Sequence, residues 1–325
     1  MIVQIHMKTN LEESILNTET KSAFIAVIGR PNVGKSSFVN SAVGQKIAIV
    51  SDKPQTTRTR IMGVLTRCAT QLVFVDTPGF HKPKNKLDEH MAKATKGGLS
   101  DVEAAVLVVE AVTKFKFDPN SLPPAELTLI EECKKRKLPL ILAINKIDLL
   151  DSKDKLLEII AAYMSVFPFE AVVPFSAKNG DGTDILCEEI FKFAKPSPHY
   201  FDSDTVTDQA DKIMIAEMIR EKILTLLSDE VPHGTAVEIE QYYERDNAAG
   251  EPILEVGATI YCEKDSHKGI IIGRGGSMLK KIGSLSRRDI ENFYGAKVSL
   301  NLWVKVKEDW RNRGGIIHSL GLDIS

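Results

Sequence analysis

The chain of 325 residues has only four cysteines and no long hydrophobic run. The cysteines lie far apart without C-x-x-C spacing, which argues against a zinc site and a disulfide framework and is typical of a reducing cytosol. They are Cys68, Cys133, Cys187 and Cys262. Apolar runs such as residues 104–109 are too short for a membrane span, and the opening residues 1–8 are too interrupted for a signal peptide. These absences predict a cytoplasmic protein.

The sequence also lacks a large excess of charge of either sign. Its formal net charge is -2, so the overall charge indicates no nucleic-acid partner, and any basic surface must be local. A content of 43% hydrophobic and 26% charged residues is ordinary for a globular protein. The length is about twice that of a typical domain, which predicts two domains.

A phosphate-binding pattern is present near the start of the chain. Residues 29–36 read G-x-x-x-x-G-K-S, between an apolar run at 24–28 and an amphipathic segment at 37–43. Glycines let such a loop turn its N–H groups toward a polyphosphate, and the following helix adds the positive end of its dipole. Lys35 would reach the β- and γ-phosphates, and the Ser36 hydroxyl would bind Mg²⁺.

Continuous apolar runs recur through the first half, and they are typical of strands covered on both faces. They are residues 72–75, 104–109, 140–144 and 171–175. Helix-like segments such as 126–137 and 153–167 lie between them. Repeated units of this kind predict an α/β domain whose mostly parallel sheet carries helices on both faces, with the ligand at the carboxyl ends of the strands.

Three of these strands are followed by residues suited to GTP. Residues 76–79 read D-T-P-G, in which Asp76 can hold a Mg²⁺-bound water and Gly79 can approach a γ-phosphate. Residues 145–148 read N-K-I-D, and the Asp148 carboxylate can accept hydrogen bonds from guanine that adenine does not offer. Residues 176–178 read S-A-K, whose backbone could meet the guanine O6.

These four elements, in this order, resemble the first, third, fourth and fifth motifs of the translation-factor-related GTPases. The second motif of that superfamily is a mobile threonine that closes on Mg²⁺, and the candidate lies in residues 53–60. Thr57 is favoured because it directly precedes an arginine, and Thr56 is the alternative. Metal contacts are therefore expected from Ser36, from Thr57 and, through water, from Asp76. The predicted nucleotide contacts are Gly29, Arg30, Pro31, Asn32, Val33, Gly34, Lys35, Ser36, Ser37, Asp76, Thr77, Pro78, Gly79, Asn145, Lys146, Asp148, Ser176, Ala177 and Lys178.

One departure from Ras-like proteins concerns hydrolysis. Phe80 stands where those proteins have a glutamine that orients the attacking water, so slow basal hydrolysis is expected. The resemblance implies that Asn32 accompanies a catalytic K⁺, whose charge would replace that of an arginine finger. Lys35, Asn32, Thr57 and Gly79 are the predicted catalytic residues. Residues 80–87 are predicted to be a second switch, in which His81 is interpreted as an exposed loop residue rather than a general base.

The second half shows a different pattern, with the element order α-β-β-α-α-β. The expected elements are a helix at 213–228, strands at 236–242 and 254–262, an apolar half-turn before 273, a helix at 277–293 and a strand at 297–307. Residues 273–276 form a G-x-x-G turn and resemble the loop of a type II KH domain. In such a domain the loop and two helices clamp about four nucleotides.

Charge in this half favours RNA. Residues 264–313 contain twelve Lys and Arg against five Asp and Glu, a local excess of +7. Trp303 and Trp310 are interpreted as packing residues rather than base platforms. The predicted RNA contacts are Gly273, Arg274, Gly275, Gly276, Lys268, Lys280, Lys281 and Arg287. The predicted divisions are a leader (1–20), a GTPase domain (21–198), a linker (199–211), a KH domain (212–313) and a tail (314–325).

This combination resembles the Era family from about residue 22 to residue 312. The resemblance implies a GTP-hydrolysing switch of small-subunit ribosome assembly that uses Mg²⁺, with K⁺ as a candidate second cation, and whose KH domain binds the 3′ end of 16S rRNA in the 30S subunit. It also implies a monomer with peripheral association with the inner face of the cell membrane. Two alternatives stay open: a GTP-dependent tRNA-modification or RNA-chaperone factor, and a module that binds GTP with little hydrolysis. A tandem-GTPase factor is excluded by the single phosphate loop.

Overall fold

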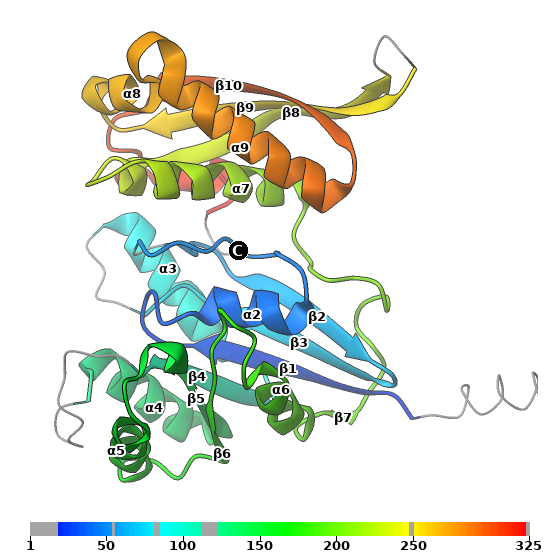
Figure 1. Cartoon of the computed structure of the whole chain (residues 1–325), viewed down its shortest axis with the longest axis vertical. Helices are drawn as coiled ribbons and strands as arrows, with labels where there is room; N and C mark the ends of the chain where they lie inside the picture. The colour runs from blue at the N-terminus through cyan, green and yellow to red at the C-terminus, as the bar shows by residue number, and fades with distance from the viewer. Residues whose placement is uncertain (1–18, 54–55, 81–84, 112–121, 247–249, 323–325) are drawn as a thin grey trace, which may run out of the picture.

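A computed structural model describes residues 19–53, 56–80, 85–111, 122–246 and 250–322 (Figure 1). An N-terminal domain, from β1 to β7, is built on one large sheet. A C-terminal domain, from α7 onward, lies above it in the view of Figure 1 and is built on a smaller sheet. Predictions that concern residues 1–18 and His81 fall outside the described part of the chain.

The large sheet has the strand order β2-β3-β1-β4-β5-β6. Neighbouring strands are parallel except for β2, which is antiparallel to β3; the short β7 pairs antiparallel with β1. The strands are β1 (Lys21–Ile28), β2 (Ile61–Arg67), β3 (Thr70–Asp76), β4 (Ala104–Glu110), β5 (Leu140–Asn145), β6 (Ala171–Pro174) and β7 (Lys195–Pro196). Because β4 lies between β1 and β5, the loops that follow these three strands are neighbours at one edge of the sheet.

Helices cover both faces of this sheet, as its apolar strands require. Alternate residues of β1 point into two different cores: Ile25 packs with α2 and α6, whereas Ala26 packs with α4 and α5. The helices are α2 (Lys35–Val43), α3 (Lys86–Gly97), α4 (Pro124–Arg136), α5 (Lys153–Met164) and α6 (Thr183–Phe191), with a 3₁₀ turn η2 (Ile147–Leu149). The predicted α/β fold is confirmed.

The C-terminal domain has the predicted order α-β-β-α-α-β. Its sheet runs β10-β9-β8, with β9 parallel to β10 and antiparallel to β8. The helices pack on one face of the sheet, where apolar residues of β9 and β10 join those of α7 and α9 in one core. The elements are α7 (Asp211–Leu226), η3 (Pro232–Gly234), β8 (Ala236–Asp246), β9 (Pro252–Cys262), α8 (Asp265–Ile272), η4 (Arg274–Gly276), α9 (Ser277–Tyr294), β10 (Lys297–Val306), η5 (Trp310–Asn312) and α10 (Gly314–Ser319).

Two connecting segments are more ordered than their composition suggests. The segment expected as a linker lies along the edge strand β2, where the Val64 N–H donates to the Val206 carbonyl at 2.9 Å. Its last predicted residue, Asp211, already begins α7. The segment expected as a tail contains α10, whose Ile317 is fully buried beside Trp310. Within the described ranges, no helix has the length and apolar content to cross a bilayer.

Candidate functional site

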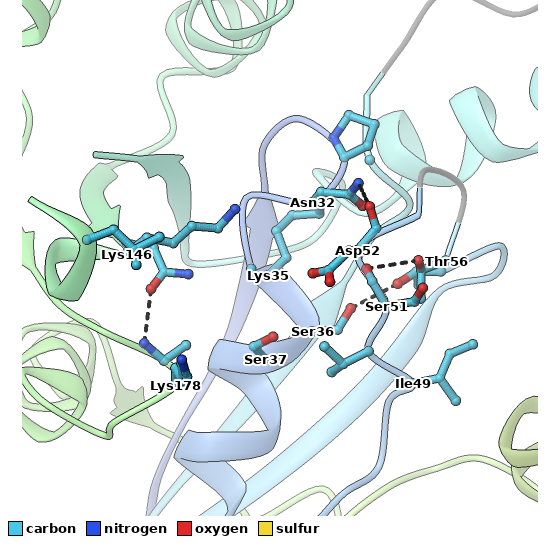
Figure 2. Close-up of a pocket in the computed structure, with 18 of the residues that line it drawn as sticks. Asn32, Lys35, Ser36, Ser37, Ile49, Ser51, Asp52, Thr56, Lys146 and Lys178 are labelled. Atoms are coloured by element: carbon cyan, nitrogen blue, oxygen red, sulfur yellow. Dashed lines mark hydrogen bonds between the residues drawn. The ribbon is translucent and has the colours of Figure 1, made fainter. Parts of the chain in front are cut away.

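A cavity of about 470 Å³ lies at the carboxyl ends of the central strands (Figure 2). It is lined by the 29–36 loop, the start of α2, the segment before β2, Gly79 and the residues that follow β5 and β6. The four sequence motifs therefore meet in one place. Seven predicted nucleotide contacts do not line the cavity: Gly29, Arg30, Val33, Asp76, Thr77, Pro78 and Ser176. The other predicted nucleotide contacts do.

The phosphate loop brings a buried ammonium to the cavity. Gly34 has a φ of 99°, and a Cβ there would lie 2.0 Å from the Asn145 side chain, so only glycine fits. Lys35 follows as the first residue of α2 and is 6% exposed, with its Nζ donating to the carbonyls of Gly29 at 3.2 Å and Arg30 at 2.9 Å. Burial lowers the pKa of Lys35 to about 8, against the opposing effect of Asp76. An anion in the cavity would favour the charged ammonium.

Three oxygen-bearing side chains converge beside this lysine and fit a Mg²⁺ ion. The Ser36 hydroxyl lies 2.9 Å from the Thr57 hydroxyl and donates to Asp76 Oδ2 at 2.6 Å. Asp76 Oδ1 is buried without a hydrogen-bond partner among the described residues, and burial raises the pKa of Asp76 to about 6. No group of three His, Cys, Asp or Glu that could hold a metal occurs in the described ranges. One carboxylate with hydroxyls suits Mg²⁺, which takes further ligands from phosphates and water.

The two candidate switch threonines occupy different positions. The Thr56 hydroxyl donates to the backbone carbonyl of Lys53 at 2.6 Å, whereas the Thr57 hydroxyl meets Ser36. The geometry therefore favours Thr57 as the metal contact. The segment before these threonines contributes cavity residues that the sequence did not reveal. They are Ile49, Val50, Ser51 and Asp52, which match no motif; Leu149, next to N-K-I-D, was also missed.

The base-recognition end is held by side-chain hydrogen bonds. Asn145 donates to the Val33 carbonyl at 2.8 Å and accepts from the Ala177 N–H at 3.0 Å, which joins three of the motifs. The Ser176 hydroxyl donates to Asp148 Oδ1 at 2.7 Å. The Asp148 carboxylate is exposed at the cavity and keeps acceptor capacity for a base.

The positions of Phe80 and Asn32 bear on the prediction of slow hydrolysis. Phe80 packs against the core beneath α4 and α5, and its backbone N–H donates to the Gly29 carbonyl at 3.2 Å. Its side chain has no hydrogen-bonding group for an attacking water. Asn32 has a φ of 64° and donates from Nδ2 to the Asp52 carbonyl at 2.6 Å, as Figure 2 shows.

A second concave surface lies in the C-terminal domain, between α9 and β10. It encloses about 500 Å³ and is lined by Gly276, Lys280 and Arg287 among the predicted RNA contacts. Arg274 and Gly275 are exposed at its end, where the turn has φ values of 73° at Gly273, 57° at Gly275 and 77° at Gly276. The backbone of this turn is therefore accessible to a ligand. Lys281, on another face of α9, and Lys268, on α8, do not line the groove.

Comparisons with known proteins agree with this arrangement. The family described as 50S ribosome-binding GTPase matches residues 24–146, and the KH domain family matches residues 230–311. The chain is 48% identical over 302 residues to the GTPase Era of Ruminiclostridium cellulolyticum, covering 93% of this chain and 97% of that protein. It is 48% identical over 301 residues to the GTPase Era of Clostridioides difficile, covering 93% and 98%.

Two solved structures are similar over the same extent. One is Era in complex with MgGDPNP and nucleotides 1506–1542 of 16S ribosomal RNA, with a TM-score of 0.87 and 32% identity. The other is a single-substitution variant of Aquifex aeolicus Era bound to GDP·AlF4⁻, with a TM-score of 0.86 and 32% identity. Each similarity covers 94% of this chain and 100% of the other.

Proposed function

The chain belongs to the Era family of GTPases, and on that premise we propose that it is a nucleotide-controlled switch of small-subunit ribosome assembly. In this proposal the N-terminal pocket binds GTP, with Mg²⁺ held by Ser36, Thr57 and, through water, Asp76. The groove beside Arg274 binds the 3′ end of 16S rRNA. One observation supports control of the RNA groove by the nucleotide pocket: both neighbours of Thr57 contact the C-terminal domain.

These contacts come from Thr56 and Arg58. The Thr56 carbonyl accepts a hydrogen bond from the Arg220 guanidinium on α7. Arg58 is 2% exposed and donates to the carbonyls of Thr235 at 2.6 Å and His233 at 2.9 Å. Its guanidinium also lies over the Trp310 ring, 5.6 Å from the centroid. Thr57 already lies beside Ser36 while its two neighbours hold the C-terminal domain, so loss of a metal ion from Thr57 would release these contacts.

The same interface has features that allow it to open. Burial and the nearby charge of Arg220 lower the pKa of Arg58 to about 9. Arg58 Nε and Arg220 Nη1 are buried with no hydrogen-bond partner in the described ranges. Arg220 is paired with Glu217 at 2.7 Å, but an unpaired buried N–H on each of two adjacent cations still costs free energy, and in this proposal loss of the metal ion from Thr57 favours another arrangement.

The helix after the D-T-P-G motif makes a second connection. Leu87 and Met91 of α3 are buried in one cluster with Trp310 and Ile317, and the Lys86 N–H donates to the Asn312 side chain at 3.4 Å. Figure 1 shows α3 and the segment before β2 on the side of the N-terminal domain that faces α7. In related switches, two segments are ordered by contacts with the γ-phosphate and Mg²⁺. Here the segment before β2 and helix α3, which occupy the corresponding places in the chain, both touch the C-terminal domain. In this proposal, the GTP-bound arrangement presents the C-terminal domain for RNA, and hydrolysis reverses it.

The proposal predicts a nucleotide-dependent affinity for RNA. An oligonucleotide with the sequence of the 16S rRNA 3′ end should bind about tenfold more tightly with a non-hydrolysable GTP analogue than with GDP, a coupling typical of two-state proteins. Arg58→Ala should reduce this ratio to nearly one, because it removes the contact next to Thr57. Fluorescence anisotropy with the protein saturated in each nucleotide measures the ratio.

The matched control is Arg67→Ala. Arg67 is 39% exposed and pairs with Asp184 at 3.1 Å on the surface of the N-terminal domain, so this variant should keep the wild-type ratio. Equal RNA affinity with the two nucleotides in the wild-type protein would reject the control of RNA binding. If Arg58→Ala keeps the wild-type ratio of the two RNA affinities, only the role of the Arg58 contact is rejected, and the control of RNA binding by nucleotide is not.

Hydrolysis is predicted to depend on K⁺. Asn32 donates from Nδ2 to the Asp52 carbonyl at the phosphate end of the pocket, and its Oδ1 is an oxygen ligand of the kind that suits a hard cation. A K⁺ ion, when bound, would add positive charge near the phosphates, where the Phe80 side chain offers neither a charge nor a hydrogen bond. Phosphate release should be about 10–100-fold faster in K⁺ than in Na⁺, with similar GTP affinity in both salts. Equal turnover in the two salts would contradict the assignment of Asn32.

A phosphate-release assay also tests whether the chain hydrolyses GTP or only binds it. The family is one of GTPases, so release is expected, and RNA should not be required for it in K⁺. The monomeric state and the peripheral contact with the inner membrane face stay predictions from the family resemblance.

A further inference from the structure

A carboxylate outside the known motifs lies between the two halves of the nucleotide pocket. Glu110 is the last residue of β4, the strand between β1 and β5 in the sheet, and it is in register with Asn145. Its Oε2 accepts a salt bridge from Lys146 Nζ at 2.7 Å, and its Oε1 lies 3.7 Å from Arg30 Nη2. Glu110 itself does not line the cavity. It therefore contacts a residue of the phosphate loop and a residue of the guanine motif without contacting their ligand.

Helix α4 anchors the Arg30 side of this network. Arg30 Nε donates to Glu126 on α4 at 2.5 Å, and the Glu126 side chain is fully buried and also accepts a hydrogen bond from the Tyr163 hydroxyl. The Arg30 carbonyl accepts from Lys35 Nζ at 2.9 Å. A displacement of Arg30 would therefore reach the phosphate-binding lysine.

On its other side, the network reaches the residues expected to bind the guanine base through Lys146. Lys146 lines the cavity and has a φ of 65°, a left-handed conformation that begins the η2 turn carrying Asp148. A left-handed backbone at a residue other than glycine costs free energy and requires support from its surroundings. The salt bridge to Glu110 supplies such support.

We propose that Glu110 is a positioning residue for nucleotide binding, which holds the Lys146 side of the pocket at a fixed distance from the phosphate loop. This inference rests on the proposed use of the pocket for a guanine nucleotide. Because the two loops follow β1 and β5, they have no direct strand pairing with each other. Asn145 joins the two loops by its hydrogen bond to the Val33 carbonyl, and Glu110 at the end of the intervening strand adds a second, charged connection through Lys146 at 2.7 Å and Arg30 at 3.7 Å.

The test is the affinity of the full chain for the fluorescent nucleotide mant-GDP. Glu110→Gln keeps the side-chain size but removes the charge, and it should weaken binding about tenfold, which corresponds to about 1.4 kcal/mol. Glu110→Asp keeps the charge and should bind within about threefold of the wild type. Glu132→Gln, the same substitution in a partly exposed surface pair with Arg136 on α4, is the matched control and should bind as the wild type does.

A double-mutant cycle separates positioning from a general structural effect. Lys146→Met keeps the aliphatic part of the side chain and removes its charge. If Glu110 acts through Lys146, the double variant Glu110→Gln, Lys146→Met should bind no more weakly than the weaker single variant. Losses that multiply in the double variant, or a loss below twofold in Glu110→Gln, would overturn the inference. Failure of the wild-type chain to bind mant-GDP would instead reject the proposed nucleotide pocket.

Discussion

Replacing Asp148 with asparagine is expected to lower the affinity for GTP at least about 100-fold and to create a preference for XTP. The Ser176 hydroxyl occupies Asp148 Oδ1 at 2.7 Å, which leaves acceptor positions of the carboxylate for the N1–H and 2-amino groups of guanine. An asparagine would turn an NH₂ group toward these donors. Two hydrogen bonds to a charged group, at about 1.5–3 kcal/mol each, would be lost.

The change of preference is the sharper part of this prediction. Xanthine has a carbonyl at position 2 where guanine has an amino group, so it can accept the hydrogen bond that an asparagine donates. Displacement of mant-GDP by GTP, XTP and ATP measures the three affinities. Asp151→Asn is the matched control, because Asp151 is exposed and forms a surface pair with Lys155 at 2.9 Å, one helical turn away. GTP affinity within threefold of the wild type in Asp148→Asn would contradict the assignment of the base site.

The site residues that the sequence revealed share one physical property. The first, third, fourth and fifth motifs directly follow strands of the parallel sheet, and the apolar runs of these strands are easily recognised because both faces are buried. Once the strands are placed, the parallel arrangement brings their carboxyl ends to one edge. Lys35, Ser36 and Asp148 therefore meet in space even though the longest separation among them exceeds 100 positions.

Elements without such a signal were missed. Strand β2 pairs with β3 through a tight turn at Cys68, which has a φ of 52°. Turns of this kind are usually marked by glycine or asparagine, and this one has neither. The helix α10 is only six residues long and begins with two glycines, so its sequence resembles a loop; its order comes from the burial of Ile317 beside Trp310.

The contacts between the domains could not be predicted from sequence periodicity either. Arg58 and the Thr235 carbonyl that it binds are 177 positions apart, and Thr235 lies in no motif. Arg58 reads as part of an exposed polar loop, although it is buried in the structure. Docking of one folded domain on another determines this burial, and a local pattern holds no information about it.

Reversing the charge of Arg274 is expected to lower RNA affinity at least about 100-fold without changing nucleotide affinity. Arg274 is exposed in the turn 273–276, where three glycines with positive φ allow the backbone to approach phosphates closely. Arg274→Glu would remove one cation from this turn and place an anion next to the phosphates. Anisotropy with the 16S rRNA 3′-end oligonucleotide, in the presence of a GTP analogue, measures the loss, and mant-GDP binding checks the distant pocket.

Salt dependence shows whether the loss is local. Binding of a single strand weakens with salt by roughly 0.7 logarithmic units per neutralised phosphate, so Arg274→Glu should reduce the slope of the salt plot by about that amount. Lys135→Glu, on the exposed surface of α4 in the N-terminal domain, makes the same change in net charge and serves as the matched control. It should leave both affinity and slope within twofold of the wild type. An equal loss in the two variants would mean that overall charge, rather than the turn, binds the RNA.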